Sequence, residues 1–319
     1  MNEKIRHLRE KLKAFEYAFT IINWDTETEA PVGALDKRSD VIGVISSMYN
    51  DLIFNQEYVD SVNYLFEHIE LLDELLQREI YKVKKNLDST LKLPKELLIE
   101  FSVVTAKAGP AWVEAKQNDN FSIFEPHLTR IVEMQKEMIT YLETNELKGY
   151  DVLLDQYEEG MTVKKYDQFF ELLKKELVPL IKEISQREYS YKLDFANKCY
   201  PVEKQKEFAK YIAEVMCFDY AHGLDKESEH PFTSGNGRND VRLTNHYYED
   251  YFVSSIFSMI HELGHATFDQ QVSEKFDDTV LEGCTAMALH ESQSRFYENI
   301  VGRSYAFWTK HYPKLKETF

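Results

Sequence analysis

Apolar residues recur every three to four positions along most of the chain, which is the spacing of one face of an α-helix. In the opening segment these positions are Ile5, Leu8, Leu12, Phe15 and Phe19. Segments with the same spacing cover residues 57–87, 94–118, 122–144, 166–184 and 203–217. The pattern therefore predicts a mostly α-helical protein.

One short stretch departs from the helical spacing. Apolar and polar residues alternate over residues 240–244, and the turn-forming residues 234–237 precede them, a combination typical of strands. We expect one or two strands here. The sequence shows no repeat at a fixed period, no low-complexity segment and no linker. We therefore predict a single domain over residues 1–319, with a helical part at about 1–190 and a part at about 191–319 that holds the candidate chemistry.

Composition and charge narrow the class of protein. The 319 residues include 38 Lys and Arg against 55 Asp and Glu, so the formal net charge is −17. Nucleic acid and anionic membranes require a basic surface, so neither is an expected partner. The charged N-terminus lacks the apolar core of a signal peptide. Three widely spaced cysteines form no C-x-x-C pair, which argues against a disulfide framework or a thiolate metal site. We expect a cytoplasmic protein.

Candidate chemistry lies in the motif formed by His261, Glu262 and His265. Two histidines four positions apart lie on one side of a helix, so both imidazoles can reach one metal ion, and the glutamate can face a water. The surrounding residues are apolar nearly all round the helix, and buried histidines need partners that a metal supplies. The alternative is a helix whose histidines merely face the core or solvent.

A catalytic zinc site needs a third protein ligand and an open position. Residues 281–299 predict a following helix, with Glu291 in its middle. Glu282 and Glu298 are the alternative ligands, one early in this helix and one late, and an isolated mid-helix glutamate commonly lies in solvent. We expect Glu291 to complete the site. Zinc is the expected metal, although two histidines and a carboxylate also suit cobalt or manganese.

The sequence resembles the Taq-type metallocarboxypeptidase family in motifs that follow one another in the family's order. The four motifs nearest the candidate site are His230-Pro231-Phe232, Asp240-Val241-Arg242-Leu243-Thr244, His261-Glu262-Leu263-Gly264-His265 and His290-Glu291-Ser292-Gln293. Further matches are Asn23-Trp24-Asp25, Trp112-Val113-Glu114-Ala115-Lys116 and Tyr157-Glu158-Glu159-Gly160-Met161-Thr162. The resemblance implies a helical metallopeptidase fold around a deep groove, with a small β-sheet near the active site. It also implies a homodimer that removes residues from peptides with a free C-terminus, using one divalent metal ion.

Carried over motif by motif, the resemblance implies that His261, His265 and Glu291 hold the metal and that Glu262 is the general base on a metal-activated water. It also implies that His230 and His290 line the site near the substrate; His290 could instead orient a metal ligand.

An exopeptidase needs a cation for the terminal carboxylate, and arginine suits this role. The arginines near the motifs are Arg238, Arg242, Arg295 and Arg303. Arg242 is our candidate for substrate binding, and its alternative role is a structural ion pair.

Two further motifs of the family, I-R-x-x-A-D and G-x-x-Q-D-x-H-W, do not occur in this sequence. We therefore expect the chain to lack the family's C-terminal portion. The expected function is a metal-dependent carboxypeptidase. The alternatives are a related helical zinc oligoendopeptidase, which would also cleave amidated peptides, and a non-catalytic truncated homologue that retains the metal site.

Overall fold

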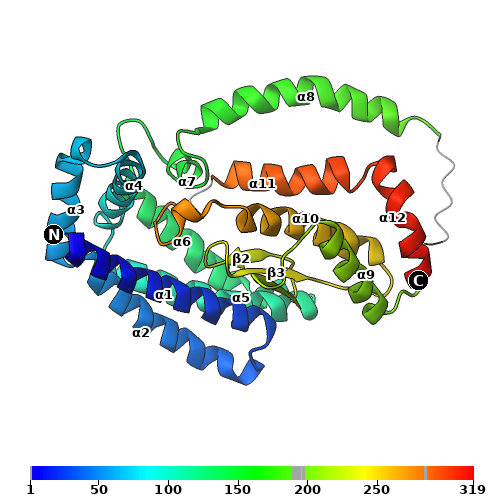
Figure 1. The fold of residues 1–319 in the computed structure, drawn as a ribbon, viewed down its shortest axis with the longest axis horizontal. Helices are drawn as coiled ribbons and strands as arrows, with labels where there is room; N and C mark the ends of the chain where they lie inside the picture. Colours follow the sequence, from blue (N-terminus) through cyan, green and yellow to red (C-terminus); the bar gives the residue numbers. More distant parts are fainter. Residues whose placement is uncertain (1, 189–194, 196–197, 284–285) are drawn as a thin grey trace. The chain divides into compact units, whose positions relative to one another are not determined.

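A computed structural model describes residues 2–188, 195, 198–283 and 286–319, so Cys284 lies outside the described residues. Over these ranges the chain forms twelve α-helices and three short β-strands (Figure 1). The predicted fold class, mostly helical with a small sheet, is confirmed. No helix in the described ranges is both long and apolar enough to cross a membrane.

The chain folds into two compact units, each assembled from three separate segments. Unit 1 comprises Met1–Leu142, Asp219–Asn245 and Ala266–Thr285. Unit 2 comprises Glu143–Phe218, His246–His265 and Ala286–Phe319. The single domain expected from the sequence, with parts at about 1–190 and 191–319, stays a prediction.

The helical part of unit 1 is built from six α-helices. They are α1 (Asn2–Thr28), α2 (Leu35–Ile53), α3 (Gln56–Glu67), α4 (Glu74–Thr90), α5 (Lys95–Gln117) and α6 (Glu125–Leu142). Helix α2 packs against α5, and α5 against α6. The helix expected over residues 57–87 is in fact two helices, α3 and α4. The side chain of Asp73 caps α4 by accepting a hydrogen bond from the backbone N–H of Leu76, which starts a new helix there.

Unit 1 also contains the three-stranded sheet, with strands β1 (Gly223–Glu227), β2 (Thr233–Gly235) and β3 (Val241–Asn245). Strand β3 lies in the middle, parallel to β1 and antiparallel to β2. The stretch predicted at 240–244 corresponds to β3, where Val241 and Leu243 are fully buried. The sheet thus has three strands, where one or two were expected.

Unit 2 holds the remaining helices. They are α7 (Tyr150–Tyr157), α8 (Val163–Ser185), α9 (Val202–Val215), α10 (Phe252–Gln270), α11 (Met287–Arg295) and α12 (Tyr305–Thr318), with the first fourteen residues of α10 counted here. Phe208 of α9 stacks on Trp308 of α12, with ring centroids 6.4 Å apart, and Phe257 of α10 meets the same indole edge-on. The helix expected over residues 281–299 begins only at Met287, and from Phe296 to Val301 it widens into a π-helical turn.

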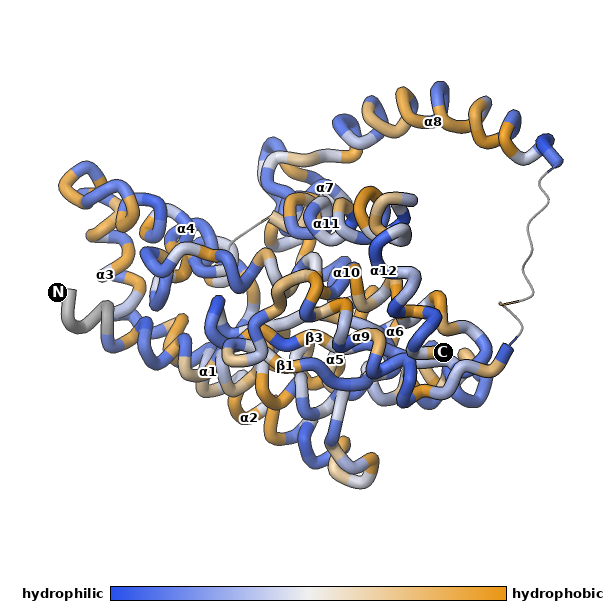
Figure 2. Tube along the Cα trace, turned by 45° about the vertical axis from the view of Figure 1, so that its right-hand side comes forward, coloured by the Kyte–Doolittle hydropathy of each residue, from blue (hydrophilic) through white to orange (hydrophobic). Residues whose placement is uncertain are grey.

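Helix α8 differs from the other long helices because none of its residues is buried. Figure 2 shows apolar and polar residues recurring side by side in successive turns of this helix. The apolar row of α8 is defined by the exposed large side chains that share one face of the helix, Phe169, Phe170, Leu177, Leu180, Ile181 and Ile184. An amphipathic helix normally buries such a row against a neighbour.

Candidate metal centre

The two motif histidines lie one turn apart on α10, with ring centroids 5.0 Å apart. Met259, Ile260 and Leu263 of the same helix are almost fully buried. Because these apolar side chains fix the rotation of α10, His261 and His265 are held on a defined side of the helix.

Helix α11 brings Glu291 to the two imidazoles. Oε2 of Glu291 lies 3.6 Å from Nε2 of His261 and 3.4 Å from Nε2 of His265. One ligand atom from each of the three residues falls within 4.8 Å of the others. Three such donors around one point are the geometry expected for a cation bound by two imidazoles and a carboxylate.

A glycine explains how α11 can come so close. A Cβ atom placed on Gly264 would lie 2.7 Å from Cα of Ser294 and 3.3 Å from the backbone oxygen of Gln293. Any other residue at position 264 would therefore collide with the backbone of α11. Backbone atoms inside a helix cannot move aside as the end of a flexible side chain can. The close contact between α10 and α11 that places Glu291 beside the histidines therefore requires glycine at position 264.

The second nitrogen of each imidazole also has a partner. Nδ1 of His261 lies 3.0 Å from Oε2 of Glu298, and Nδ1 of His265 lies 2.9 Å from Nδ1 of His290. Metal-binding histidines commonly engage their other nitrogen in this way, which fixes the ring and its tautomer. Both Nε2 atoms are left turned toward Glu291, so the donor set fits a divalent cation such as zinc.

Arginines hold the acidic side chains in their charged form. Burial by itself would raise the pKa of Glu291, but the hydrogen bond from Arg295 and the charges of the nearby imidazoles outweigh it and lower this pKa below its usual value. Burial likewise opposes ionisation of Glu298, and hydrogen bonds from Arg303 and His261 lower its pKa as well. Both carboxylates are therefore available as anions at neutral pH.

Glu262 follows His261 on α10, and only 7% of its surface is exposed. A buried carboxylate next to two candidate ligands is the arrangement that the H-E-x-x-H motif uses for a general base. His261, Glu262, His265, His290 and Glu291 all belong to unit 2.

The other two candidates from the sequence, His230 and Arg242, belong to unit 1. His230 meets the ring of Trp112 edge-on, with centroids 6.5 Å apart. Nε and Nη2 of Arg242 donate to the two carboxylate oxygens of Asp240, at 2.7 and 2.9 Å, and its guanidinium lies over the ring of Trp24. This is the ion pair that the sequence offered as the alternative for Arg242, whose role in substrate binding stays a prediction.

The sequence offers Glu298 only as an alternative ligand and not as the partner of His261, and the close packing at Gly264 was not expected from it. Two signals were present: seven residues separate Glu298 from Glu291, which returns it to the same helix face, and a glycine inside a buried helix usually marks close packing. His290, expected to line the site or to orient a metal ligand, lies against His265.

The family model and the similar proteins all indicate one family of carboxypeptidases. Residues 4–319 match the family described as Carboxypeptidase Taq (M32) metallopeptidase. Carboxypeptidase 1 of Bacillus subtilis (strain 168) is 35% identical over 310 residues, which are 97% of this chain and 62% of that protein. Thermostable carboxypeptidase 1 of Pyrococcus furiosus is 34% identical over 99% of this chain and 64% of its own length. This chain therefore spans less than two thirds of the length of these two relatives.

Solved structures agree with the sequence comparisons. The crystal structure of BsuCP superposes with a TM-score of 0.95 at 34% identity, covering 99% of this chain and 63% of that one. Trypanosoma cruzi metallocarboxypeptidase 1 superposes with a TM-score of 0.85 at 26% identity, over 99% of this chain and 64% of that one.

Proposed function

Because the chain belongs to the Carboxypeptidase Taq (M32) metallopeptidase family, we propose that it is a metal-dependent carboxypeptidase that hydrolyses the C-terminal peptide bond of peptides. The observation that carries this proposal is the convergence of Nε2 of His261, Nε2 of His265 and Oε2 of Glu291. Glu262 lies in the same motif and supplies the base that peptide hydrolysis requires.

His261, His265 and Glu291 would hold one divalent cation, with zinc as the first choice and cobalt or manganese as alternatives. When bound, such a cation polarises the scissile carbonyl and makes a water acidic enough to attack it near neutral pH. The imidazoles must be unprotonated to serve as ligands, so activity should fall as the pH drops through the range in which imidazoles gain a proton.

Glu262 carries the proton in the proposed reaction. Its carboxylate takes a proton from the attacking water and then delivers it to the nitrogen of the departing amino acid. Burial of this side chain keeps competing water away from the transferred proton.

The substrate class follows from the family. We propose peptides with a free C-terminus as substrates, cleaved by a cytoplasmic homodimer. His230, Arg242 and His290 are the candidates for substrate contacts. For Arg242 this role would require part of its hydrogen bonding to Asp240 to be given up.

The test measures metal content and turnover on one preparation of this chain. Metal is quantified by elemental mass spectrometry, and release of the terminal amino acid from an N-blocked dipeptide is followed. Glu262→Gln serves as the matched variant, because it keeps the size of the side chain and removes its basicity. We expect one metal ion per chain in both proteins and a loss of activity of about 10²- to 10⁴-fold in the variant.

Other results would redirect the proposal. Metal without turnover would support the ligand set and argue against catalysis by this chain. Cleavage of C-terminally amidated peptides would favour the oligoendopeptidase. Absence of metal from zinc-supplemented protein would overturn the ligand assignment.

A further inference from the structure

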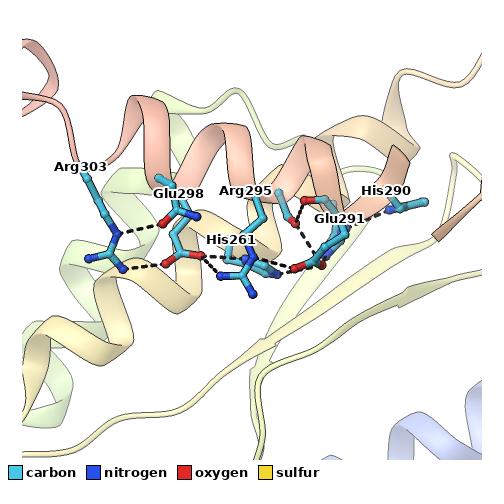
Figure 3. A network of polar contacts seen from close by, with 9 residues as sticks. His261, His290, Glu291, Arg295, Glu298 and Arg303 are labelled. Atoms are coloured by element: carbon cyan, nitrogen blue, oxygen red, sulfur yellow. Dashed lines mark hydrogen bonds and ion pairs between the residues drawn. The ribbon is translucent and has the colours of Figure 1, made fainter. Parts of the chain in front are cut away.

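Glu298 is a buried carboxylate, 8% exposed, that belongs to the π-helical turn after α11. Three donors surround it in Figure 3, and all come from unit 2. They are Nδ1 of His261 at 3.0 Å, Nη2 of Arg303 at 2.7 Å and Nη1 of Arg295 at 3.2 Å. A buried carboxylate is costly unless it is satisfied in this way, so the arrangement requires a reason.

The contact with His261 is to the nitrogen that does not face Glu291. Both oxygens of Glu298 already accept from arginine, Oε1 from Nη2 of Arg303 and Oε2 from Nη1 of Arg295, and a carboxylate paired in this way can only accept hydrogen bonds. Nδ1 of His261 must therefore carry the proton. In the neutral ring that metal binding requires, the lone pair is then on Nε2, the atom 3.6 Å from Oε2 of Glu291.

We propose that Glu298 is a positioning residue, which fixes the ring and tautomer of His261 so that Nε2 is ready to bind the metal. This inference rests on the proposed function, since it concerns the same metal ligands. Glu298 would not touch the metal or the substrate; it would act through His261.

The two arginines make Glu298 a fixed support. Arg303 also donates from Nε to Oδ1 of Asn299, and its guanidinium lies 3.9 Å from the ring centre of Phe257 on α10. Arg303 therefore links the π-helical turn to the helix that carries His261. Turns of this kind recur at functional sites.

Arg295 connects Glu298 with the third candidate ligand. Its Nε donates to Oε1 of Glu291 at 2.7 Å, while its Nη1 donates to Glu298. One guanidinium thus orients Glu291 with Oε2 toward the histidines and also donates to Glu298, the carboxylate that contacts His261. The ligand and its support are parts of one network.

The test compares zinc binding and the state of the His261 ring in the full chain. Glu298→Ala removes the acceptor, and Glu298→Gln keeps an acceptor oxygen but loses the charge. Glu183→Ala is the matched control, because it removes an arginine-paired glutamate, partnered by Arg187, from exposed α8. Zinc affinity is measured by competition with a chelator, and the ring tautomer is read from ¹⁵N–¹H spectra of the metal-free protein.

We expect zinc affinity to fall by about 10- to 100-fold in Glu298→Ala, less in Glu298→Gln, and not at all in Glu183→Ala. We also expect the ring of His261 in Glu298→Ala to change from a single Nδ1-protonated form to a mixture of tautomers. A residue that supports only the fold would change thermal stability and leave both readouts in place.

A folded Glu298→Ala protein with unchanged zinc affinity and tautomer would overturn the positioning role while leaving the metal site intact. A parent protein that binds no zinc would overturn the metal site and this role together. If Glu298→Ala fails to fold, Glu298→Gln and Arg303→Ala decide the question, because the first keeps a side chain of the same size and the second leaves Glu298 in place while removing one of its donors.

Discussion

At the scale of single residues, two arginine–carboxylate pairs of this chain have different consequences. Arg295 leaves one oxygen of Glu291 facing the histidines and binds the other. Arg242 instead engages both oxygens of Asp240 and rests on Trp24. Arg295 therefore orients an oxygen of Glu291 toward the candidate metal position, whereas Arg242 forms a bidentate pair with Asp240, which also accepts a hydrogen bond from the hydroxyl of Tyr17.

The Arg242–Asp240 pair makes stability depend on pH. The hydrogen bond from Arg242 holds the pKa of Asp240 below its usual value. The pair therefore stabilises the fold fully above the unfolded-state pKa of about 3.9, and this contribution is lost as the pH falls through the lower folded-state value. We expect Arg242→Gln to lower the free energy of unfolding by about 1 kcal/mol at pH 7. The difference should shrink toward zero in acid, as measured by urea unfolding at a series of pH values.

Arg130→Gln is the control for this experiment, since its pair with Glu100 is much more exposed and should contribute less. If Arg242→Gln raised KM for peptides and left the unfolding curves unchanged at every pH, Arg242 would be a substrate residue rather than a structural one.

At the scale of elements, the close approach of α10 and α11 at Gly264 decides whether Glu291 reaches the histidines. In Gly264→Ala the added methyl group would lie 2.7 Å from the Cα atom of Ser294. The helices must then separate, which should cost about 1–3 kcal/mol of stability and weaken zinc binding by moving Glu291 away. Thermal unfolding of the metal-free protein and chelator competition measure the two effects.

Gly33→Ala provides the matched control, because nothing lies within 4 Å of a Cβ atom placed there. It should leave both measurements unchanged. Zinc affinity that stayed at the parent level in Gly264→Ala would show that α11 can shift without carrying Glu291 out of reach.

The sequence predicts elements well where one periodic segment is one helix. Residues 94–118, 122–144 and 203–217 correspond to α5, α6 and α9 within three residues at each end. The prediction of one helix over residues 57–87 was wrong because α3 and α4 have the same helical period. The cap at Asp73, which separates them, is a weak local signal. Strands β1 and β2 were missed because Gly223–Glu227 and Thr233–Gly235 do not alternate between apolar and polar residues, and their pairing with β3 is a long-range event.

The candidate ligands were predictable because two spacings in the sequence place them. The H-E-x-x-H motif needs only a helix, and Glu291 needs only a second helix after it. The bond between His261 and Glu298 depends on a π-helical turn and on two arginines, and neither follows from periodicity. Tertiary contacts of this kind become visible only when the helices are in place.

At the scale of the whole molecule, the apolar row of α8 departs from ordinary burial. Leu177 and Ile181 of this row are 44% and 60% exposed. We expect the double substitution Leu177→Lys and Ile181→Lys to reduce binding of an apolar fluorescent dye and light scattering at high protein concentration. Because neither side chain is packed in a core, the free energy of unfolding should change by about 0.5 kcal/mol or less.

Val32→Lys is the comparison, since this residue is 84% exposed and lies outside α8. It should leave dye binding near the parent level. A large loss of stability in the α8 variant would mean that the row packs against protein in solution.

The interleaving of the two units bears on how the chain is made. Residues 1–142 are synthesised before the other segments of the two units, yet unit 1 receives its last segment only when residue 285 has been added, and unit 2 needs residues 286–319 as well. Helices α1–α6 can pack early because their contacts with one another lie within residues 1–142, but neither unit is complete until late in synthesis, and long-range pairing is slow to form. Incomplete cores then stay exposed during elongation, when aggregation competes with folding. The yield of native protein should therefore respond to translation speed and chaperone supply more strongly than the stability of the finished fold does.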